Sequence, residues 1–162
     1  MSWLLQRVDD RLIHGQILVA WAQPLHPERI WVVDDAAAAN AWERDLMSSA
    51  APDIEVRIVT VAVMAGLWAQ EDAAPGGAFL LVRDLRAALA LVEAGAAIAR
   101  LNLGGVHYAP GRTKVNEYIY LDDEDRARAR ALLARGVALE VQDVPAAAPR
   151  PLSSLDPASA PA

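Results

Sequence analysis

The chain has 162 residues and a formal net charge of −6, with 54% hydrophobic and 22% charged residues. This length suits one domain with its own core, while the acidic balance without a Lys/Arg block argues against a broad nucleic-acid-binding surface. The absence of cysteine excludes disulfides, thiolate catalysis and Cys-based zinc sites, and the lack of a signal peptide or a bilayer-length apolar run predicts a soluble, cytoplasmic protein.

Short apolar runs alternate with alanine-rich helical stretches along the whole chain. The runs predicted to form strands cover residues 4–8, 29–33, 55–60, 78–82, 99–102, 118–121 and 138–141. Several consist almost wholly of Val, Ile and Leu, which is typical of strands buried on both faces. The stretches predicted to form helices cover residues 16–22, 36–48, 61–70, 84–94 and 123–135.

Residues typical of helix ends support these boundaries. Asp84 and either Asp122 or Asp123 stand where N-caps belong, and Gly95 and Gly136 stand where C-cap glycines belong. Strand–helix alternation with short connections implies right-handed βαβ units. We therefore predict an α/β fold with a single, mostly parallel sheet of about seven strands, helices on both faces, and the active loop after the first strand.

The loop after the first predicted strand carries the most informative residues, in the sequence RVDDRLIHGQ at positions 7–16. A histidine at a strand end, beside a glycine and the N–H groups of a helix start, is suited to hold a phosphoryl group. His14 occupies this position, and the alternative is a structural loop histidine. Arg11, three residues earlier, can bind phosphate oxygens in a forked geometry and favours a neutral imidazole.

Two carboxylates precede this histidine. Asp9 or Asp10 can accept a hydrogen bond from the ring of His14 and so fix its tautomer. The alternative is that they pair with Arg7 or Arg11, or cap the next helix, and both roles can hold at once.

Two other loops are expected beside the first, because the carboxyl ends of parallel strands meet at one edge of a sheet. They cover residues 34–35 and 102–111. Within the second, the sequence Asn-Leu-Gly-Gly at 102–105 indicates a tight turn that lets the backbone approach a ligand or another loop. Asp34 and Asp35 are a poor metal-ligand set and are interpreted as a loop or helix cap, and His107 is interpreted as an incidental loop residue.

The last part of the chain, residues 145–162, is rich in Pro, Ala and Ser. Its only large apolar residues are Leu152 and Leu155. We therefore predict a domain over residues 1–144, followed by a mobile or loosely docked tail.

The sequence at 7–16, with Trp21 after it, resembles the enzyme IIB component of the mannose/fructose/sorbose family of the sugar phosphotransferase system (PTS). The resemblance continues in Ile-Trp-Val-Val-Asp-Asp at 30–35 and in the Asn-Leu-Gly-Gly loop. It also includes Gly-Arg-Thr-Lys-Val-Asn at 111–116 and the predicted final strand. In order and spacing it covers residues 4–144.

This resemblance implies a phosphohistidine–sugar phosphotransferase that works in the cytoplasm and can associate peripherally with membrane subunits. It implies that His14 accepts a phosphoryl group at Nδ1 from phospho-enzyme IIA and passes it to a sugar translocated by IIC and IID. The catalytic partners implied are Arg11 and Asp9. The residues expected around the phosphate are Asp10, Gly15, Gln16, Asp35, Gly104 and Gly105. No metal or other cofactor is implied, because the incoming group is already activated.

The chain also departs from the family pattern, and alternatives stay open. Asp34 replaces a Ser or Asn and is expected to add a carboxylate near the phosphate rim, which weakens phosphate binding. The Pro/Ala-rich tail replaces a polar C-terminal helix and is expected to change docking. The alternatives are a regulatory phosphohistidine carrier not coupled to transport, and a non-catalytic binding module that retains the fold. The sugar and homo-oligomerisation are also left open.

Overall fold

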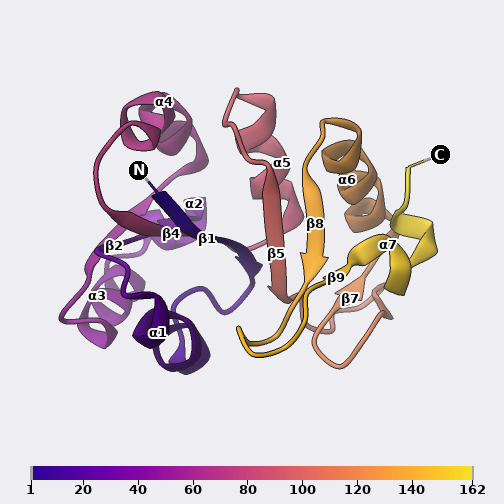
Figure 1. The fold of residues 1–162 in the computed structure, drawn as a ribbon, viewed down its shortest axis with the longest axis horizontal. Coiled ribbons are helices and arrows are strands. Elements are labelled where there is room, and N and C mark those ends of the chain that lie inside the picture. The colour runs from indigo at the N-terminus through magenta and orange to yellow at the C-terminus, as the bar shows by residue number, and fades with distance from the viewer. Residues whose placement is uncertain (1, 162) are drawn as a thin grey trace.

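The structure, a computed structural model, describes residues 2–161. Its main sheet contains seven strands in the order β3-β2-β4-β1-β5-β8-β9 (Figure 1). Their bounds are β1 Ser2–Asp9, β2 Arg29–Val33, β3 Glu55–Val59, β4 Gly77–Val82, β5 Arg100–Gly105, β8 Ala138–Val141 and β9 Arg150–Pro151. Every neighbouring pair is parallel except β8 and β9. The sheet is therefore mostly parallel, as predicted.

Helices cover both faces of this sheet. The helical segments are η1 Ile17–Ala22 (a π-helix), α1 Gln23–Leu25, α2 Asp35–Ala39, α3 Ala41–Ala50, α4 Val61–Asp72, α5 Leu85–Glu93, α6 Asp123–Ala134, α7 Leu152–Leu155 and the 3₁₀ turn η2 Pro157–Ser159. Among the described residues, no helix combines the length and apolarity needed to cross a bilayer.

Two apolar cores lie on opposite sides of the sheet, as alternating residues of β4 show. Phe79 and Leu81 pack with residues of η1, α2 and α3. Leu80 and Val82 pack with residues of α4, α5 and α6. Since successive strand residues point to opposite faces, the doubly covered α/β architecture predicted from the sequence is confirmed (Figure 1).

One predicted strand, over residues 118–121, does not join the main sheet. Only β7, Tyr120–Leu121, is extended there, and it pairs antiparallel with β6, Thr113–Lys114, in a separate small sheet. No helix lies between β5 and this segment, and its only parallel pairing among the described residues is an isolated bridge between Val106 and Ile119. The seventh strand of the main sheet is instead β9.

The single helix predicted over residues 36–48 is broken at Asn40. The backbone of Asn40 is extended, with φ −109° and ψ 104°, and its side chain accepts hydrogen bonds from the N–H groups of Trp42 and Glu43. Asparagine is among the strongest N-cap residues, so it ends α2 and starts α3 within a stretch whose alanines favour helix throughout.

The described part of the segment predicted as a mobile tail, residues 145–161, packs against the domain. Arg150–Pro151 pair with β8, and Leu152 is fully buried in the same core as β8. Arg126 of α6 donates from Nε to Asp156 at 3.0 Å. Strand pairing, a buried leucine and an ion pair thus dock a segment whose composition suggests disorder. Its mobility and the boundary at residue 144 stay predictions.

Candidate functional site

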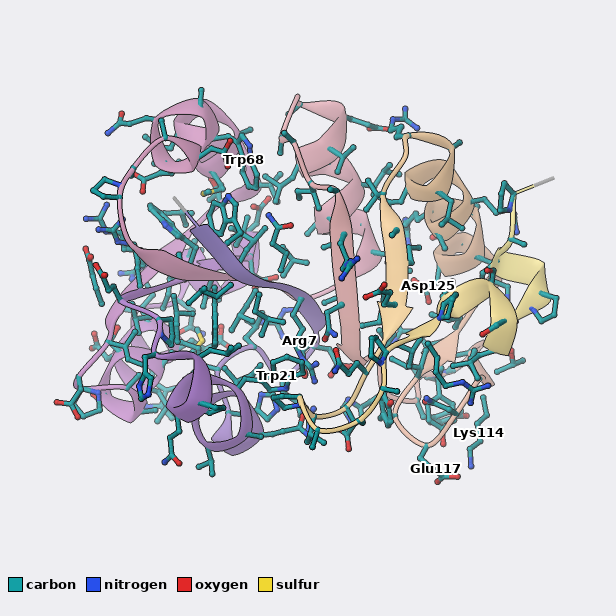
Figure 2. All side chains as sticks on the ribbon, in the orientation of Figure 1. Arg7, Trp21, Trp68, Lys114, Glu117 and Asp125 are labelled. Carbon is teal, nitrogen blue, oxygen red and sulfur yellow. The ribbon has the colours of Figure 1, made fainter. Side chains whose placement is uncertain are left out.

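β1 carries two charged residues, Arg7 and Asp9, that are fully buried at its carboxyl end. They are two positions apart and therefore point to the same side of the strand, where Arg7 Nε lies 3.3 Å from Asp9 Oδ2. Burial lowers the pKa of Arg7, and the carboxylate of Asp9 opposes that shift. Figure 2 shows Arg7 beside Trp21 at this end of β1, with the guanidinium 5.1 Å from the indole centroid.

The guanidinium of Arg7 ties together the ends of three neighbouring strands. Its Nη1 donates to the Asn102 side chain on β5 and to the Gln142 carbonyl after β8, the latter at 2.9 Å. Its Nη2 donates to the Asp143 carbonyl at 3.2 Å and to Gln16 Oε1 at 3.3 Å. Because these donors are used within the protein, Arg7 organises the site and is not free to bind a ligand.

Gly104 and Gly105 make room for these side chains. A Cβ atom at Gly104 would lie 1.7 Å from the guanidinium carbon of Arg7, and one at Gly105 would lie 2.7 Å from Asp9 Oδ1. The glycine pair therefore permits close approach, as the sequence suggested, but what approaches is the end of β1. The two residues belong to β5 itself, not to a turn after it.

Arg11 binds the carboxylate of Asp9 from the solvent side. Its backbone N–H and Nε donate to Oδ1 at 3.2 and 3.0 Å, and its Nη2 donates to Oδ2 at 3.0 Å. These hydrogen bonds raise the pKa of Arg11. The Arg11 side chain is 37% exposed while that of Asp9 is fully buried, so of these two charged groups it is the guanidinium of Arg11 that faces solvent.

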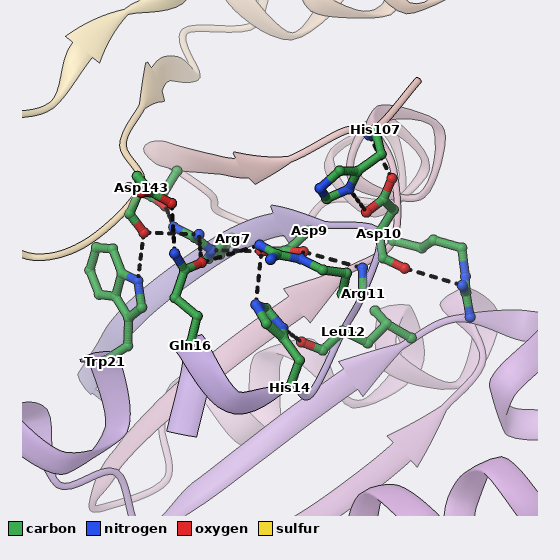
Figure 3. A network of polar contacts seen from close by, with 12 residues as sticks. Arg7, Asp9, Asp10, Arg11, Leu12, His14, Gln16, Trp21, His107 and Asp143 are labelled. Atoms are coloured by element: carbon green, nitrogen blue, oxygen red, sulfur yellow. Dashed lines mark hydrogen bonds and ion pairs between the residues drawn. The ribbon is translucent and has the colours of Figure 1, made fainter. Parts of the chain in front are cut away.

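His14 lies beside the same carboxylate (Figure 3). Its Nδ1 is 2.9 Å from the carbonyl oxygen of Leu12, and since a carbonyl only accepts, Nδ1 carries the proton. Leu12 has the uncommon φ of +56°, which forms the turn between Asp9 and His14. His14 Nε2 is buried without a hydrogen-bond partner, 3.8 Å from Asp9 Oδ2. The expected phosphoryl acceptor, Nδ1, is therefore engaged by Leu12 in this conformation.

The helical turn that follows begins at Gly15 and leads into the π-helix η1, a rare form that is frequent at functional sites. Gln16 accepts at Oε1 from Arg11 Nη2 at 3.2 Å and donates from Nε2 to Asp143 Oδ1 at 2.6 Å. Trp21 Nε1 donates to the Asp143 carbonyl at 3.2 Å. Gln16 thus connects the exposed arginine to the end of β8.

The loops after β1 and β5 meet through Asp10. Its backbone N–H donates to the Gly105 carbonyl at 2.9 Å, and its two carboxylate oxygens accept from the backbone N–H and Nδ1 of His107 at 2.7 and 2.6 Å. These two loops were predicted to lie together. His107, interpreted as incidental, is instead the residue that joins them.

Asp34, at the end of β2, caps α2 and forms a two-pronged ion pair with Arg83, with both distances at 3.0 Å. Burial disfavours its ionised form, but the hydrogen bonds from Arg83 and Ala37 prevail, so the pKa of Asp34 lies below its usual value. Arg83 also donates to the Asp10 carbonyl at 3.3 Å. The extra carboxylate expected at the phosphate rim is therefore neutralised by Arg83.

Asp35 is not brought to the His14 loop. Its carboxylate accepts a hydrogen bond from the N–H of Val61, at the start of α4, at 2.9 Å. It also lines a cavity of about 680 Å³, which alanines of α4 and α5 share with Arg83 and Arg86. Among the residues expected around the phosphate, Asp35 alone is engaged elsewhere.

Sequence reasoning missed Gln142 and Asp143, and it gave Arg7 and Asn102 no part in holding the site together. Arg7 was considered only as a partner of the aspartates, although a cation inside an otherwise apolar strand, two positions from a carboxylate, is a signal of a buried pair. Gln142 and Asp143 follow β8, so the rule that sites form at the carboxyl ends of parallel strands would have included them.

Comparisons with known proteins agree with this geometry. The profile of the family described as PTS system sorbose subfamily IIB component matches residues 3–158. The chain is 36% identical over 141 residues to the PTS system mannose-specific EIIAB component of Escherichia coli K12, covering 86% of this chain but 44% of that longer protein. It is 32% identical to the PTS system sorbose-specific EIIB component of Lacticaseibacillus casei, covering 86% of both. The crystal structure of the IIBSor domain of the sorbose permease from Klebsiella pneumoniae superposes with a TM-score of 0.88 at 28% identity, covering 96% of both chains.

Proposed function

This chain belongs to the sorbose subfamily of PTS IIB components, and from that premise we propose that it is a phosphocarrier that works through His14. In this proposal His14 accepts a phosphoryl group from a phosphohistidine on a mannose-type IIA protein. It then passes the group to a sugar handled by the membrane subunits IIC and IID.

The observation that carries the proposal is the arrangement of His14, Asp9 and Arg11. When the imidazole proton moves from Nδ1 to Nε2, the Nε2–H group can donate a hydrogen bond to Asp9 Oδ2, which is now 3.8 Å away. The lone pair of Nδ1 is then free to attack phosphorus once the ring turns away from the Leu12 carbonyl. Asp9 thus orients the nucleophile without itself reacting, as an orienting carboxylate does.

Arg11 supplies the charge that an incoming phosphoryl group needs. Its exposed guanidinium can turn from Asp9 to the equatorial oxygens of the phosphoryl group and bind them in a forked geometry. The first N–H groups of the helical turn that begins at Gly15 add donors and a favourable dipole. Such positioned donors stabilise the spread charge of an in-line transfer.

Intact mass spectrometry tests this proposal. The protein is incubated with phosphoenolpyruvate, the general PTS proteins and a mannose-type IIA domain, with and without acid treatment. We expect one acid-labile phosphoryl group, its loss in His14→Ala, and its retention in His26→Ala, because His26 lies at the C-terminal end of α1. Label that persists in His14→Ala, or no uptake from a competent phospho-IIA, would contradict the proposal, and the second result would favour a non-catalytic binding module.

Onward transfer separates sugar transport from a purely regulatory carrier. Membrane vesicles that contain mannose-type IIC and IID are mixed with the phosphorylated protein and a panel of sugars. We expect a sugar phosphate to appear as phospho-His14 disappears. A phosphoprotein that is stable against every vesicle and sugar would instead favour the regulatory alternative.

A further inference from the structure

A second imidazole lies at the rim of the His14 site and is oriented by a carboxylate. His107 Nδ1 is 2.6 Å from Asp10 Oδ1, and because a carboxylate only accepts, Nδ1 carries the proton. The lone pair of a neutral imidazole is then on Nε2. The His107 side chain is 46% exposed, and Asp10 fixes the orientation of its ring. Carboxylate–histidine pairs use this arrangement for general base catalysis.

The two imidazoles share a neighbour, the buried carboxylate of Asp9. His14 Nε2 lies 3.8 Å from Asp9 Oδ2. A methyl group on Gly105 would lie 2.7 Å from Asp9 Oδ1 and 3.2 Å from His107 Cε1, so only the space above this glycine separates His107 from Asp9. Cε1 is bonded to both ring nitrogens, and since Asp10 holds Nδ1, Nε2 is the remaining nitrogen next to this edge of the ring. Figure 3 shows the Asp9–Arg11 pair between the two imidazoles in this view.

The other basic groups of the site are already occupied. Asp9 is fully buried and accepts hydrogen bonds from two arginines. Both oxygens of Asp10 are taken by His107, and Asp143 Oδ1 is taken by Gln16. His107 Nε2, by contrast, has no hydrogen-bond partner among the described residues and can take a proton.

We propose that His107 is a catalytic base that removes the proton of the hydroxyl group to which His14 gives its phosphoryl group. This inference rests on the proposed function, because it concerns the second of the two transfers. The hydroxyl oxygen forms a bond to phosphorus as the bond between phosphorus and Nδ1 of His14 breaks. The electron pair of that bond returns to Nδ1, and the hydroxyl proton moves to His107 Nε2. The leaving imidazole keeps its proton on Nε2, facing Asp9, and departs neutral.

The first transfer, from IIA to His14, does not require a base. A phosphoryl group then passes between two imidazole nitrogens, and no hydroxyl proton has to be removed. Replacement of His107 should therefore affect the two transfers differently, which a residue that only held the loop together would not do.

The charged groups that face His107 come from two segments, the end of β1 and the loop after β5. Asp10 binds Nδ1 and the backbone N–H, Asp9 lies across Gly105, and Arg112 Nη1 donates to the His107 carbonyl at 2.9 Å. The two carboxylates stabilise the protonated imidazole that the reaction forms. Arg112 contacts the backbone carbonyl and leaves the ring accessible to the acceptor.

The test compares His107→Asn with His107→Ala, using water and added glycerol as the hydroxyl acceptors. Asparagine places an N–H donor close to where Nδ1 stands, so it preserves the contact to Asp10 but lacks the basic Nε2. The protein is phosphorylated on His14 with phospho-IIA or with phosphoramidate, and the loss of acid-labile phosphate is followed by intact mass over a range of pH.

We expect both variants to lose the phosphoryl group to either acceptor at least about 10-fold more slowly than the wild type, a modest value for general base catalysis. The wild-type rate should rise with pH as the base loses its proton, and both variants should lack this rise. Uptake from phospho-IIA should stay within about 2-fold, since general base catalysis is absent from that step.

Each opposite outcome has a distinct meaning. Equal rates of loss in all three proteins would overturn the inference and leave the proposed function intact. Wild-type behaviour of His107→Asn with a defect in His107→Ala would also overturn it, because the contact to Asp10 would then be sufficient. Failure of both donors to load His14 would refute the proposed function and this inference together.

Discussion

At the scale of single residues, Arg7 and Arg11 bind the same carboxylate but differ in what they can do for a ligand. Arg7 is fully buried and its donors are used by neighbouring strand ends, whereas the side chain of Arg11 is 37% exposed. The charge of Arg7 therefore keeps Asp9 in place. The guanidinium of Arg11 can leave Asp9 and bind a phosphoryl group, because the buried carboxylate of Asp9 keeps its ion pair with Arg7.

Arg11→Lys should slow phosphoryl uptake by His14 on the order of 10-fold or more, because lysine keeps the charge but loses the forked contact. The free energy of unfolding should change by less than about 1 kcal/mol, as expected for a partly exposed ion pair. Uptake is measured by rapid quench and intact mass, and stability by urea titration. Arg128→Lys, on the surface of α6, is the matched control; equal uptake by both variants would remove Arg11 from the mechanism.

Gly104 is the residue whose replacement most directly tests the buried network. A methyl group there would lie 1.7 Å from the guanidinium of Arg7. Hydrogen bonds to Asn102, Gln142 and Asp143 hold this guanidinium in position. Gly104→Ala should cost roughly 3–5 kcal/mol, the range for breaking a buried ion pair. Gly66→Ala is the control, because nothing lies within 4 Å of its added methyl group and alanine within α4 should stabilise by roughly 0.5–1 kcal/mol. Similar urea unfolding midpoints for the two variants would contradict this account.

At the scale of elements, the sequence predicts best where one local signal decides the outcome. Runs of Val, Ile and Leu mark the central strands, and Asp84 and Asp122 cap their helices by accepting hydrogen bonds from backbone N–H groups three residues on. The break at Asn40 was missed because alanine on both sides favours helix. β9 was missed because its pairing depends on β8, which no pattern in two residues can reveal.

The candidate site divides in the same way. His14, Arg11 and Asp9 lie in one short segment whose residue types already indicate phosphate chemistry. The contributions of Gln142 and Asp143 come from more than a hundred residues away, and only the strand order places them beside β1. Local chemistry was therefore readable, whereas the residues that hold it in place depend on the topology of the sheet.

The ends of β2 and β4 are linked by Asp34 and Arg83, which makes stability depend on pH. The pKa of Asp34 is lower in the folded state than in the unfolded state, so its contribution is complete above the unfolded pKa, near 4, and is lost as pH falls through the folded value. Asp34→Asn should keep the cap of α2 and cost roughly 1–2 kcal/mol at pH 7. We expect this difference in the free energy of unfolding to shrink as pH falls below about 4.

Urea titrations at a series of pH values measure this dependence. Asp45→Asn, an exposed change on α3, is the matched control and should show no comparable trend. A difference between wild type and Asp34→Asn that stays constant from neutral to acid pH would show that Arg83 does not hold the ionised carboxylate.

At the scale of the whole molecule, the C-terminal segment connects the far edge of the sheet to the His14 loop. The chain leaves β8 through Asp143, whose carbonyl and carboxylate bind Arg7 and Gln16. It then returns as β9 along β8 and packs Leu152 into the core. We therefore predict that the segment from residue 145 unfolds together with the rest of the domain.

Leu152→Ala tests this directly. A fully buried leucine truncated to alanine should cost about 2–5 kcal/mol, because the lost contacts leave a cavity. Leu46→Ala removes the same atoms from a side chain that is 54% exposed on α3, and should cost much less. Hydrogen exchange adds a local readout, since the Asp156 N–H donates to the Leu152 carbonyl at 2.8 Å and should be protected in the wild type. A mobile tail would give the opposite pattern, with fast exchange at Asp156 and equal, small effects of the two substitutions.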